Sequence, residues 1–348
     1  MKKAQTNIDI FFSGKPQFKR CTSWLLVITF VVFSSLVVVD AEEAGFIGAN
    51  NAAQTAISGE WLADFSRKNQ DEVQFTTTRR SERGGQNNTS DGILLSELQG
   101  LTREQAFGAR TDVNFRIVRE AGTFVCEGFF RAGKGAGHWT LTPNQSFVSA
   151  MRSRGYDNLT EDNLYSAARF DITTKSIDDL KSAGYDRLSF KELVEANIFD
   201  VTPEFIREMK SAGFENLTLK QLVEARIFKV DSQFVKEVEA MGFERQPLKV
   251  LVEMRIFNIN PEFISRMRSI GFENLSYREL MDLSVHSVTP EFVNAIKAEG
   301  FSSISPRQAV ELKIHGVDGE FIRRVKAKGY ADVTLKQLVN LRIHDIVK

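Results

Sequence analysis

The segment VTPEFIREMKSAGF, at residues 201–214, contains the start and stop signals of one short helix. Thr202 is a favourable N-cap residue, and Pro203 suits the first helical position because the N–H that it lacks would be unpaired there anyway. Gly213 can end the helix in a left-handed conformation, and Phe214 can pack back against the last turn. The apolar residues between these signals share one helix face: Phe205, Ile206 and Met209. The segment therefore predicts an amphipathic helix of about 8–11 residues.

The same pattern returns every 29 residues. A second capped apolar segment follows each glycine, as at Thr218, so each unit is predicted to contain two short helices. Internal repeats of about 20–50 residues are typical of repeat architectures. We therefore predict seven units between Thr142 and His344. Each unit contains one glycine followed by an aromatic residue, and these glycines are Gly155, Gly184, Gly213, Gly242, Gly271, Gly300 and Gly329.

A unit this short cannot bury its own apolar face. We therefore expect residues 142–344 to stack as an all-α solenoid, stabilised mainly by contacts between adjacent repeats. In the second unit, Ile177 is expected to replace the phenylalanine that anchors the first helix of the other units. The expected N-caps of the first helices are Thr142, Thr202, Asp231, Asn260, Thr289 and Asp318.

Residues 58–141 have a different pattern. β-Branched and aromatic residues alternate partly with polar residues, as in residues 123–130, which is typical of strands. We expect a small antiparallel module of about five strands. Residues 82–91 are predicted to be a polar loop, and Gly133–Gly137 a hairpin connection. The expected fold class is thus α+β, with flanking segments at residues 42–57 (a linker) and 345–348 (a C-terminal tail).

Residues 1–41 have the features of an export signal. A basic segment precedes an apolar run at residues 24–39, and a small-residue cleavage site follows, with the scissile bond between Ala41 and Glu42. The run is shorter than the about 20 apolar residues of a typical spanning helix, but the basic segment is long. The alternatives are therefore a cleaved signal, an uncleaved membrane anchor and, third, a buried helix. The first two place the protein outside the cytoplasm, in the periplasm or cell envelope, with membrane contact only through this segment if it is uncleaved.

Composition narrows the range of functions. The 348-residue chain has 45 Lys and Arg and 45 Asp and Glu, whereas nucleic-acid-binding proteins usually have a basic excess. Its two cysteines cannot form a disulfide framework. Gly133–Gly137 lacks the residue order of a phosphate-binding loop, and Cys126 is expected to be a buried strand residue. We expect no nucleic-acid partner and no cofactor.

Charged columns follow the predicted second helices. In two columns, a basic residue precedes an acidic residue by four positions, so opposite charges are expected to meet on the helix surface. The columns are either a self-neutralising solvent face or a charged ladder that binds a partner. These pairs are Lys191 with Glu195, Lys220 with Glu224, Lys249 with Glu253, Arg278 with Asp282, and Arg307 with Glu311. A third column lies near helix C-termini, where the helix dipole favours cations: Arg226, Arg255, Lys313 and Arg342.

Three histidines lie 29 residues apart, at His286, His315 and His344. Stacked repeats would place equivalent positions roughly 8–10 Å apart, too far for ligands that need about 2.0–2.1 Å from one zinc ion. We interpret these histidines as half-buried helix-end residues, with a metal, ligand or pH-sensing role as the alternative. We expect no metal site and no catalytic residues, and thus a protein that is not an enzyme.

Four short segments lie before the 29-residue units or at their start: residues 115–124, 128–130, 133–137 and 142–144. Together with these units, they resemble a bacterial exported β-module followed by helical repeats. This arrangement is similar to stand-alone envelope proteins and to the extracytoplasmic regions appended to some BlaR-type antibiotic-sensor metallopeptidases. The peptidase part of those sensors is missing from this sequence. The resemblance therefore implies the architecture, and it implies neither protease activity nor site residues.

These observations predict a non-catalytic, extracytoplasmic scaffold or sensor-like binding protein, whose partner is another envelope protein. The charged columns and the β-module would together form the interaction surface. The alternative is a ligand-binding or glycan-binding accessory protein that grips its ligand through Trp61 and Trp139 of the β-module. A hydrolase is a remote third possibility.

Overall fold

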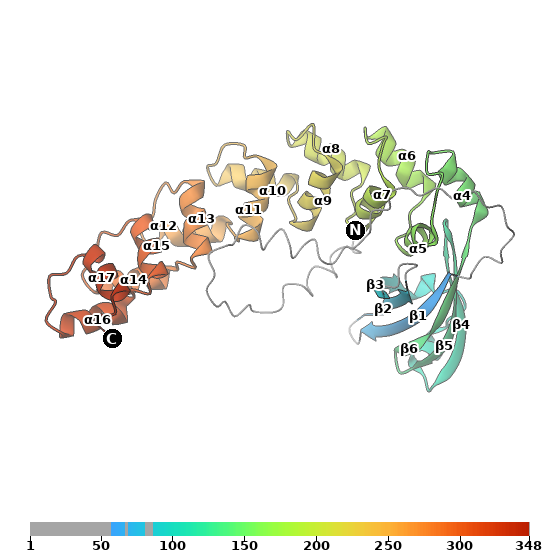
Figure 1. The fold of residues 1–348 in the computed structure, drawn as a ribbon, viewed down its shortest axis with the longest axis horizontal. Helices are drawn as coiled ribbons and strands as arrows, with labels where there is room; N and C mark the ends of the chain where they lie inside the picture. Colours follow the sequence, from blue (N-terminus) through green and yellow to red (C-terminus); the bar gives the residue numbers. More distant parts are fainter. Residues whose placement is uncertain (1–56, 67–68, 81–85, 348) are drawn as a thin grey trace. The chain divides into compact units, whose positions relative to one another are not determined.

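The computed structural model describes residues 57–66, 69–80 and 86–347 (Figure 1). The predicted signal or anchor, the Ala41–Glu42 bond and residues 42–56 of the predicted linker lie outside these ranges. The described residues contain an antiparallel sheet and fifteen α-helices, so the fold is of the mixed α+β class. The chain divides into two compact units, residues 1–206 and 207–348.

The sheet has six strands in the described residues, one more than expected. Their order is β3-β2-β1-β6-β5-β4, and every neighbouring pair is antiparallel. A short 3-10 turn (Leu95–Glu97) and helix α3 (Arg103–Phe107) connect the two edge strands. The strands are β1 (Ile57–Ser66), β2 (Asn69–Arg80), β3 (Gln86–Leu94), β4 (Thr111–Arg119), β5 (Gly122–Arg131) and β6 (Lys134–Pro143).

Strand β3 corrects the prediction of a loop at residues 82–91. Its residues pair along β2 from Gln86 to Leu94, although few of them are apolar. On the inner face, Asp91 forms an ion pair with Arg169 from a helix, so a charged residue occupies a position where an apolar one is usual. The strand therefore lacks the apolar alternation by which strands are predicted.

Strand β6 corrects the predicted hairpin at Gly133–Gly137. The turn is limited to Ala132 and Gly133, and the strand has begun by Lys134. Gly135 and Gly137 lie inside the strand because the sheet is too crowded there for a side chain. A Cβ atom would lie 2.8 Å from the Trp61 ring at Gly135 and 1.9 Å from the Glu127 carbonyl oxygen at Gly137.

The inner face of the sheet forms an aromatic core around Trp61. Its ring lies 5.8 Å from Phe75, 5.5 Å from Phe130 and 5.3 Å from Phe115, measured between ring centroids. Phe115 lies on β4, three strands away from β1 in the sheet order. Contact across that span requires a strongly curled sheet, so the topology is that of an open up-and-down barrel.

Cys126 on β5 is fully buried in this core. Burial raises the pKa of its thiol from 9.0 to about 12. The unfolded chain can ionise the thiol at lower pH than the folded chain, so the thiol's contribution to stability is complete below pH 9.0 and is lost as the pH rises toward about 12.

This pKa shift predicts a pH-dependent stability difference between the wild type and Cys126→Ala. The wild type should lose stability relative to the variant between pH 9 and pH 12, as measured by urea unfolding. A constant difference across this window would contradict the burial effect. Thiol alkylation gives a second readout, because native protein should react much more slowly than urea-unfolded protein at pH 8.

After the sheet, helix pairs recur at intervals of 29 residues. Their N-caps are short polar residues, as predicted, except Pro247 before residues 248–256. The first N-cap is Asn144 and not Thr142, because β6 continues to Pro143. The first helices are α4 (Gln145–Arg152), α6 (Thr174–Ser182), α8 (Pro203–Ser211), α10 (Ser232–Ala240), α12 (Pro261–Arg268), α14 (Pro290–Ala298) and α16 (Gly319–Ala327). The second helices are α5 (Glu161–Arg169), α7 (Phe190–Ile198), α9 (Leu219–Ile227), α11 (Leu248–Ile256), α13 (Tyr277–Val285), α15 (Pro306–Ile314) and α17 (Leu335–Ile343).

Each second helix ends in a left-handed residue that the sequence did not indicate. The backbone N–H of the residue that follows it donates to a carbonyl oxygen in the last turn of the helix. After Ser287, for example, Val288 donates to the Leu283 carbonyl oxygen at 2.8 Å. Only one of the seven residues is glycine, and it has φ 65°. The others have φ between 50° and 55°: Asp171, Asp200, Lys229, Asn258, Ser287 and Asp345.

A matched exchange tests the cost of this conformation. Ser287→Gly should raise the free energy of unfolding by about 0.5–1 kcal/mol, because a non-glycine residue is strained in the left-handed region. Gly316→Ser, at the equivalent position, should lower the free energy of unfolding by a similar amount, because it introduces the same backbone strain. No steric clash adds to this effect, since the new Cβ would meet no atom closer than 3.8 Å. Thermal unfolding of both variants measures the pair of changes. Shifts of the same sign would contradict the explanation.

Candidate interaction surface

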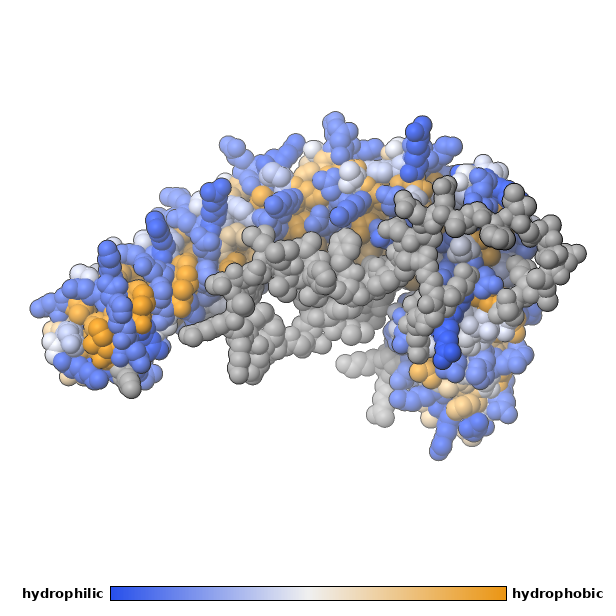
Figure 2. Space-filling view, viewed as in Figure 1, coloured by the Kyte–Doolittle hydropathy of each residue, from blue (hydrophilic) through white to orange (hydrophobic). Residues whose placement is uncertain are grey.

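The two predicted charged columns lie on the second helices, mostly at the protein surface. Figure 2 shows hydrophilic side chains projecting from the helices, with hydrophobic residues between them. Lys191, Glu195 and Glu253 are half-buried. The remaining column residues are exposed: Lys220, Glu224, Lys249, Arg278, Asp282, Arg307 and Glu311.

The expected ion pairs along each helix are not formed at four of the five sites. In the described structure, no N–O distance of 4 Å or less joins Lys191 to Glu195, Lys249 to Glu253, Arg278 to Asp282, or Arg307 to Glu311, whereas pairs at this spacing do form elsewhere, as between Lys175 and Asp179. Exposed ion pairs contribute only about 0–1 kcal/mol, so little holds them together. Most of these charges therefore face solvent.

Glu253 has another partner. Its carboxylate accepts a hydrogen bond from the Tyr277 hydroxyl group, which lies on the next second helix. Burial, this hydrogen bond and the negative charge of Glu253 hold the pKa of Tyr277 well above its usual range. The acidic column thus contributes one contact between neighbouring repeats as well as its exposed charges.

The third column packs against aromatic rings. The guanidinium carbon of Arg255 lies 3.7 Å from the centroid of the Phe234 ring on the paired first helix, and Lys313 and Arg342 lie over the equivalent rings at 4.7 Å and 5.1 Å. Arg255 also donates from Nε to the Lys229 carbonyl oxygen of the preceding repeat at 3.1 Å. Burial lowers the pKa of Arg255. These cations therefore fasten helices together, a role that the helix-dipole argument did not include.

Two kinds of polar contact join neighbouring first helices. Lys297 donates to the Ile270 carbonyl oxygen at 2.5 Å, which satisfies the end of the preceding helix. Glu208 accepts from the backbone N–H and the hydroxyl group of Ser232 at 3.2 Å and 2.6 Å, at the start of the next helix. One repeat thus caps the helix of another.

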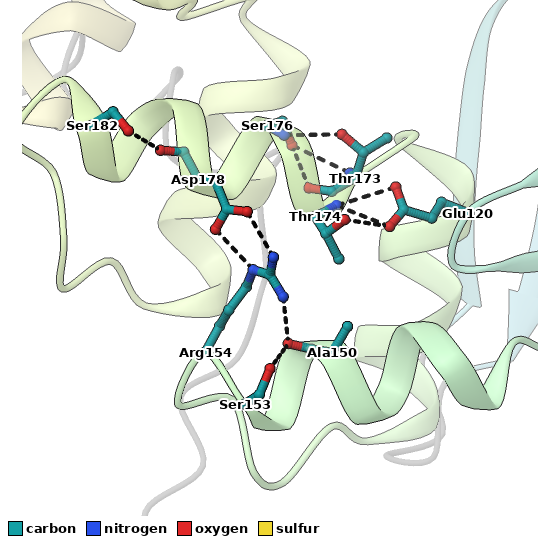
Figure 3. A network of polar contacts seen from close by, with 9 residues as sticks. All are labelled: Glu120, Ala150, Ser153, Arg154, Thr173, Thr174, Ser176, Asp178 and Ser182. Atoms are coloured by element: carbon teal, nitrogen blue, oxygen red, sulfur yellow. Dashed lines mark hydrogen bonds and ion pairs between the residues drawn. The ribbon is translucent and has the colours of Figure 1, made fainter.

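The β-module makes the same kind of cap at the first end of the array. Glu120, in the turn between β4 and β5, accepts from the N–H and hydroxyl group of Thr174 at the start of α6 (Figure 3). The residue at the Glu208 position of the first repeat is Ala150, which has no side chain for this contact. Glu120 therefore supplies from the sheet the carboxylate that the first repeat lacks.

Helix α5 covers the inner face of the sheet through polar residues. The Tyr165 ring stacks on Trp139 with centroids 5.3 Å apart, and its hydroxyl group is 2.7 Å from that of Thr77. Arg169 donates to the Thr77 hydroxyl oxygen at 3.1 Å and to the Phe75 carbonyl oxygen at 3.0 Å. Nothing in the sequence identified these contacts, because they join residues about 90 positions apart.

Trp61 and Trp139 do not form a ligand-binding surface. Each is only 1% exposed. Trp61 donates from its indole nitrogen to the carbonyl oxygens of Glu127 and His138, and Trp139 donates to that of Glu60 at 3.0 Å. Both rings are structural core residues, and the expectation that they grip a ligand is wrong.

The described residues contain no group of three or more His, Cys, Asp or Glu side chains placed to hold a metal ion. His286 and His315 are half-buried C-cap residues, and His344 is an exposed one. The cavity beside Arg119 and Arg169 has a volume of about 10 Å³, enough for one water molecule at most. None of the helices in the described ranges has the length and apolar character needed to cross a membrane.

Comparisons with protein-family models, with curated proteins and with solved structures found no match.

Proposed function

We propose that this protein is a non-catalytic interaction scaffold or sensor-like binding protein of the bacterial envelope, located outside the cytoplasm. The observation that carries the proposal is the pair of charged columns on the second helices. Their members recur every 29 residues, and most are exposed. At four sites, the basic and the acidic residue of the same helix do not form an ion pair with each other. Regularly spaced charges that mostly face solvent can be complemented by a partner protein.

The helix pairs are proposed to stack as an α-solenoid. Three kinds of contact between adjacent repeats support this architecture: a carboxylate on a helix start, an ammonium group on a helix end, and a hydroxyl group on a carboxylate. Such contacts make each repeat depend on its neighbours. An array of this kind presents a long surface to a partner.

The location outside the cytoplasm is proposed from the sequence. The apolar run at residues 24–39 follows basic residues and precedes small ones, as in an export signal or an anchor. The resemblance to extracytoplasmic β-modules followed by helical repeats agrees with this location. Burial of Trp61 and Trp139 removes the observation that favoured ligand or glycan binding.

Charge reversal on the columns tests the function. The variant Lys249→Glu with Arg278→Glu should reduce capture of an envelope protein by residues 42–348 at least about tenfold, because complementary charges would become repulsive. The matched control, Lys236→Glu with Arg268→Glu, makes the same change in net charge at exposed positions of first helices. It should retain the partner. Equal loss in both variants, or in neither, would contradict a role for the columns.

A further inference from the structure

The outer face of the sheet carries a short apolar row across three adjacent strands. Leu62 on β1, Ala136 on β6 and Phe129 on β5 are direct neighbours in the strand register, and they alternate with residues of the inner face. Leu62 is 58% exposed, whereas Ala136 and Phe129 are half-buried. The next strand on each side continues the row with a polar residue, Thr76 on β2 and Asp112 on β4. The apolar row is therefore three residues long, with the smallest side chain at its centre.

Acidic residues lie on one side of the apolar row. Two positions along the strands, Glu60, His138 and Glu127 form the neighbouring row, and all three side chains are exposed. The Glu127 carboxylate accepts a hydrogen bond from the Asn114 amide group at 3.3 Å. Among the described residues, neither carboxylate has an ion-pair partner, so this side of the apolar row is negative.

Basic residues lie on the other side of the apolar row. Asp64, Lys134 and Arg131 form the row beside the turn that joins β5 to β6. Lys134 pairs with Asp64 at 3.1 Å, whereas Arg131 is exposed and has no ion-pair partner within the described ranges. Arg110 adds a positive charge next to this row, with its guanidinium carbon 3.8 Å from the centroid of the Phe129 ring. The charge of the outer face thus changes sign across the apolar row.

The spacing of the three rows matches one face of a helix. Residues two apart on a strand lie about 6.8 Å apart, and residues four apart on a helix lie about 6 Å apart along its axis. A helix that runs along β6 would therefore place positions i−4, i and i+4 over the three rows in turn. Because the sheet curls around the strand direction, a straight helix follows its surface best along the strands. A large apolar side chain at position i would lie over Ala136.

We propose that the apolar row and the two charged rows beside it form a docking site for one helix of a partner protein. Four residues apart on one face, this helix carries a basic, a large apolar and an acidic residue. The basic residue lies over Glu60 and Glu127, and the acidic residue lies over Arg131. A second copy of this chain lacks the required charges, because with aligned strands Glu60 would meet Asp64 or Glu127 of the other copy. The site shares no residue with the charged columns, so this proposal and the proposed function can fail independently.

Peptides with three charge patterns test the partner chemistry. Each is held helical by a lactam bridge on its opposite face and carries a central leucine, flanked four residues away by lysine and glutamate, by two lysines or by two glutamates. The lysine–glutamate peptide should bind the full chain at least about fivefold more tightly than either of the others, because each of those places a like charge over one charged row. Chemical-shift changes of the Leu62 and Ala136 methyl groups locate the binding.

Charge variants of the protein should shift this preference in opposite directions. Glu60→Lys with Glu127→Lys makes both charged rows basic, so this variant should prefer the peptide with two glutamates. Arg131→Glu with Lys134→Glu makes both rows acidic, so it should prefer the peptide with two lysines. The matched control, Lys181→Glu with Lys236→Glu, changes exposed residues of first helices and should keep the preference for the lysine–glutamate peptide.

The apolar row has its own test. Leu62→Ala should weaken binding of the lysine–glutamate peptide at least about threefold, because it removes apolar surface from the contact. Leu94→Ala, at a leucine of the edge strand β3 that is 48% exposed, should not weaken it. Equal affinities of the three peptides, or binding that leaves the Leu62 and Ala136 methyl resonances unchanged, would overturn the proposal. Dimerisation that Ala136→Arg abolishes would overturn it as well, because it would assign the site to a second copy.

Discussion

Trp61→Ala is expected to lower the free energy of unfolding of the sheet by about 3–5 kcal/mol. The Trp61 ring contacts Phe75, Phe115 and Phe130, which come from three other strands, and it fills the space that Gly135 leaves open. Alanine would leave a cavity among rigid aromatic rings. Because strands on both sides of β1 meet at Trp61, the surroundings cannot collapse without uncurling the sheet.

The loss can be measured by urea unfolding of residues 42–348, followed by the fluorescence of Trp139, the other tryptophan in this segment. Leu62→Ala is the matched control, because Leu62 is the next residue on β1 but is 58% exposed. Its effect should remain within about 0.5 kcal/mol. A comparable loss in the two variants would contradict the assignment of Trp61 to the core.

Arg169→Ala is expected to destabilise the first compact unit by about 3–5 kcal/mol, because breaking a buried ion pair leaves an unpaired charge. The Arg169 side chain is 4% exposed, and the paired Asp91 is 28% exposed. The substitution also removes the donors to the Thr77 hydroxyl oxygen and the Phe75 carbonyl oxygen. The helix that covers the inner face of the sheet would then lose three of its polar contacts with the sheet.

A double-mutant cycle isolates the ion pair. Asp91→Ala should also be destabilising, and the double variant should be less destabilised than the sum of the two single variants, because neither charge is then left unpaired. Lys181→Ala is a suitable control, since Lys181 is an exposed cation on α6. Additive losses in the cycle would mean that Arg169 acts through packing and not through Asp91.

The sequence predicted the helix pairs well because their signals are local. Asn260 and Pro261 lie at one end of α12 and Gly271 follows the other end, so a few adjacent residues specify the whole helix. The burial of Ile177 in place of the usual phenylalanine was predicted correctly for the same reason. Only the first boundary was misplaced, because Thr142 has the chemistry of an N-cap but belongs to a strand.

Contacts between distant residues could not be predicted from the sequence. Glu120 resembles any polar turn residue until the sheet places it at the start of α6. Asp91 and Arg169 look like surface charges, although they meet between the sheet and α5. The charged columns were placed on the correct helices, but the direction of each side chain depends on the neighbouring repeat, as Glu253 and Tyr277 show.

The pairing of β1 with β6 has a consequence for the order of folding. Ile57 pairs with Leu141, so the first strand of the sheet has no complete site until the last strand is available. Such non-local pairing is slow compared with helix formation, which needs only nearby residues. The first strand therefore remains unpaired along one edge until synthesis reaches Pro143. The repeats emerge immediately afterwards, so the first helices can form while the sheet is still closing.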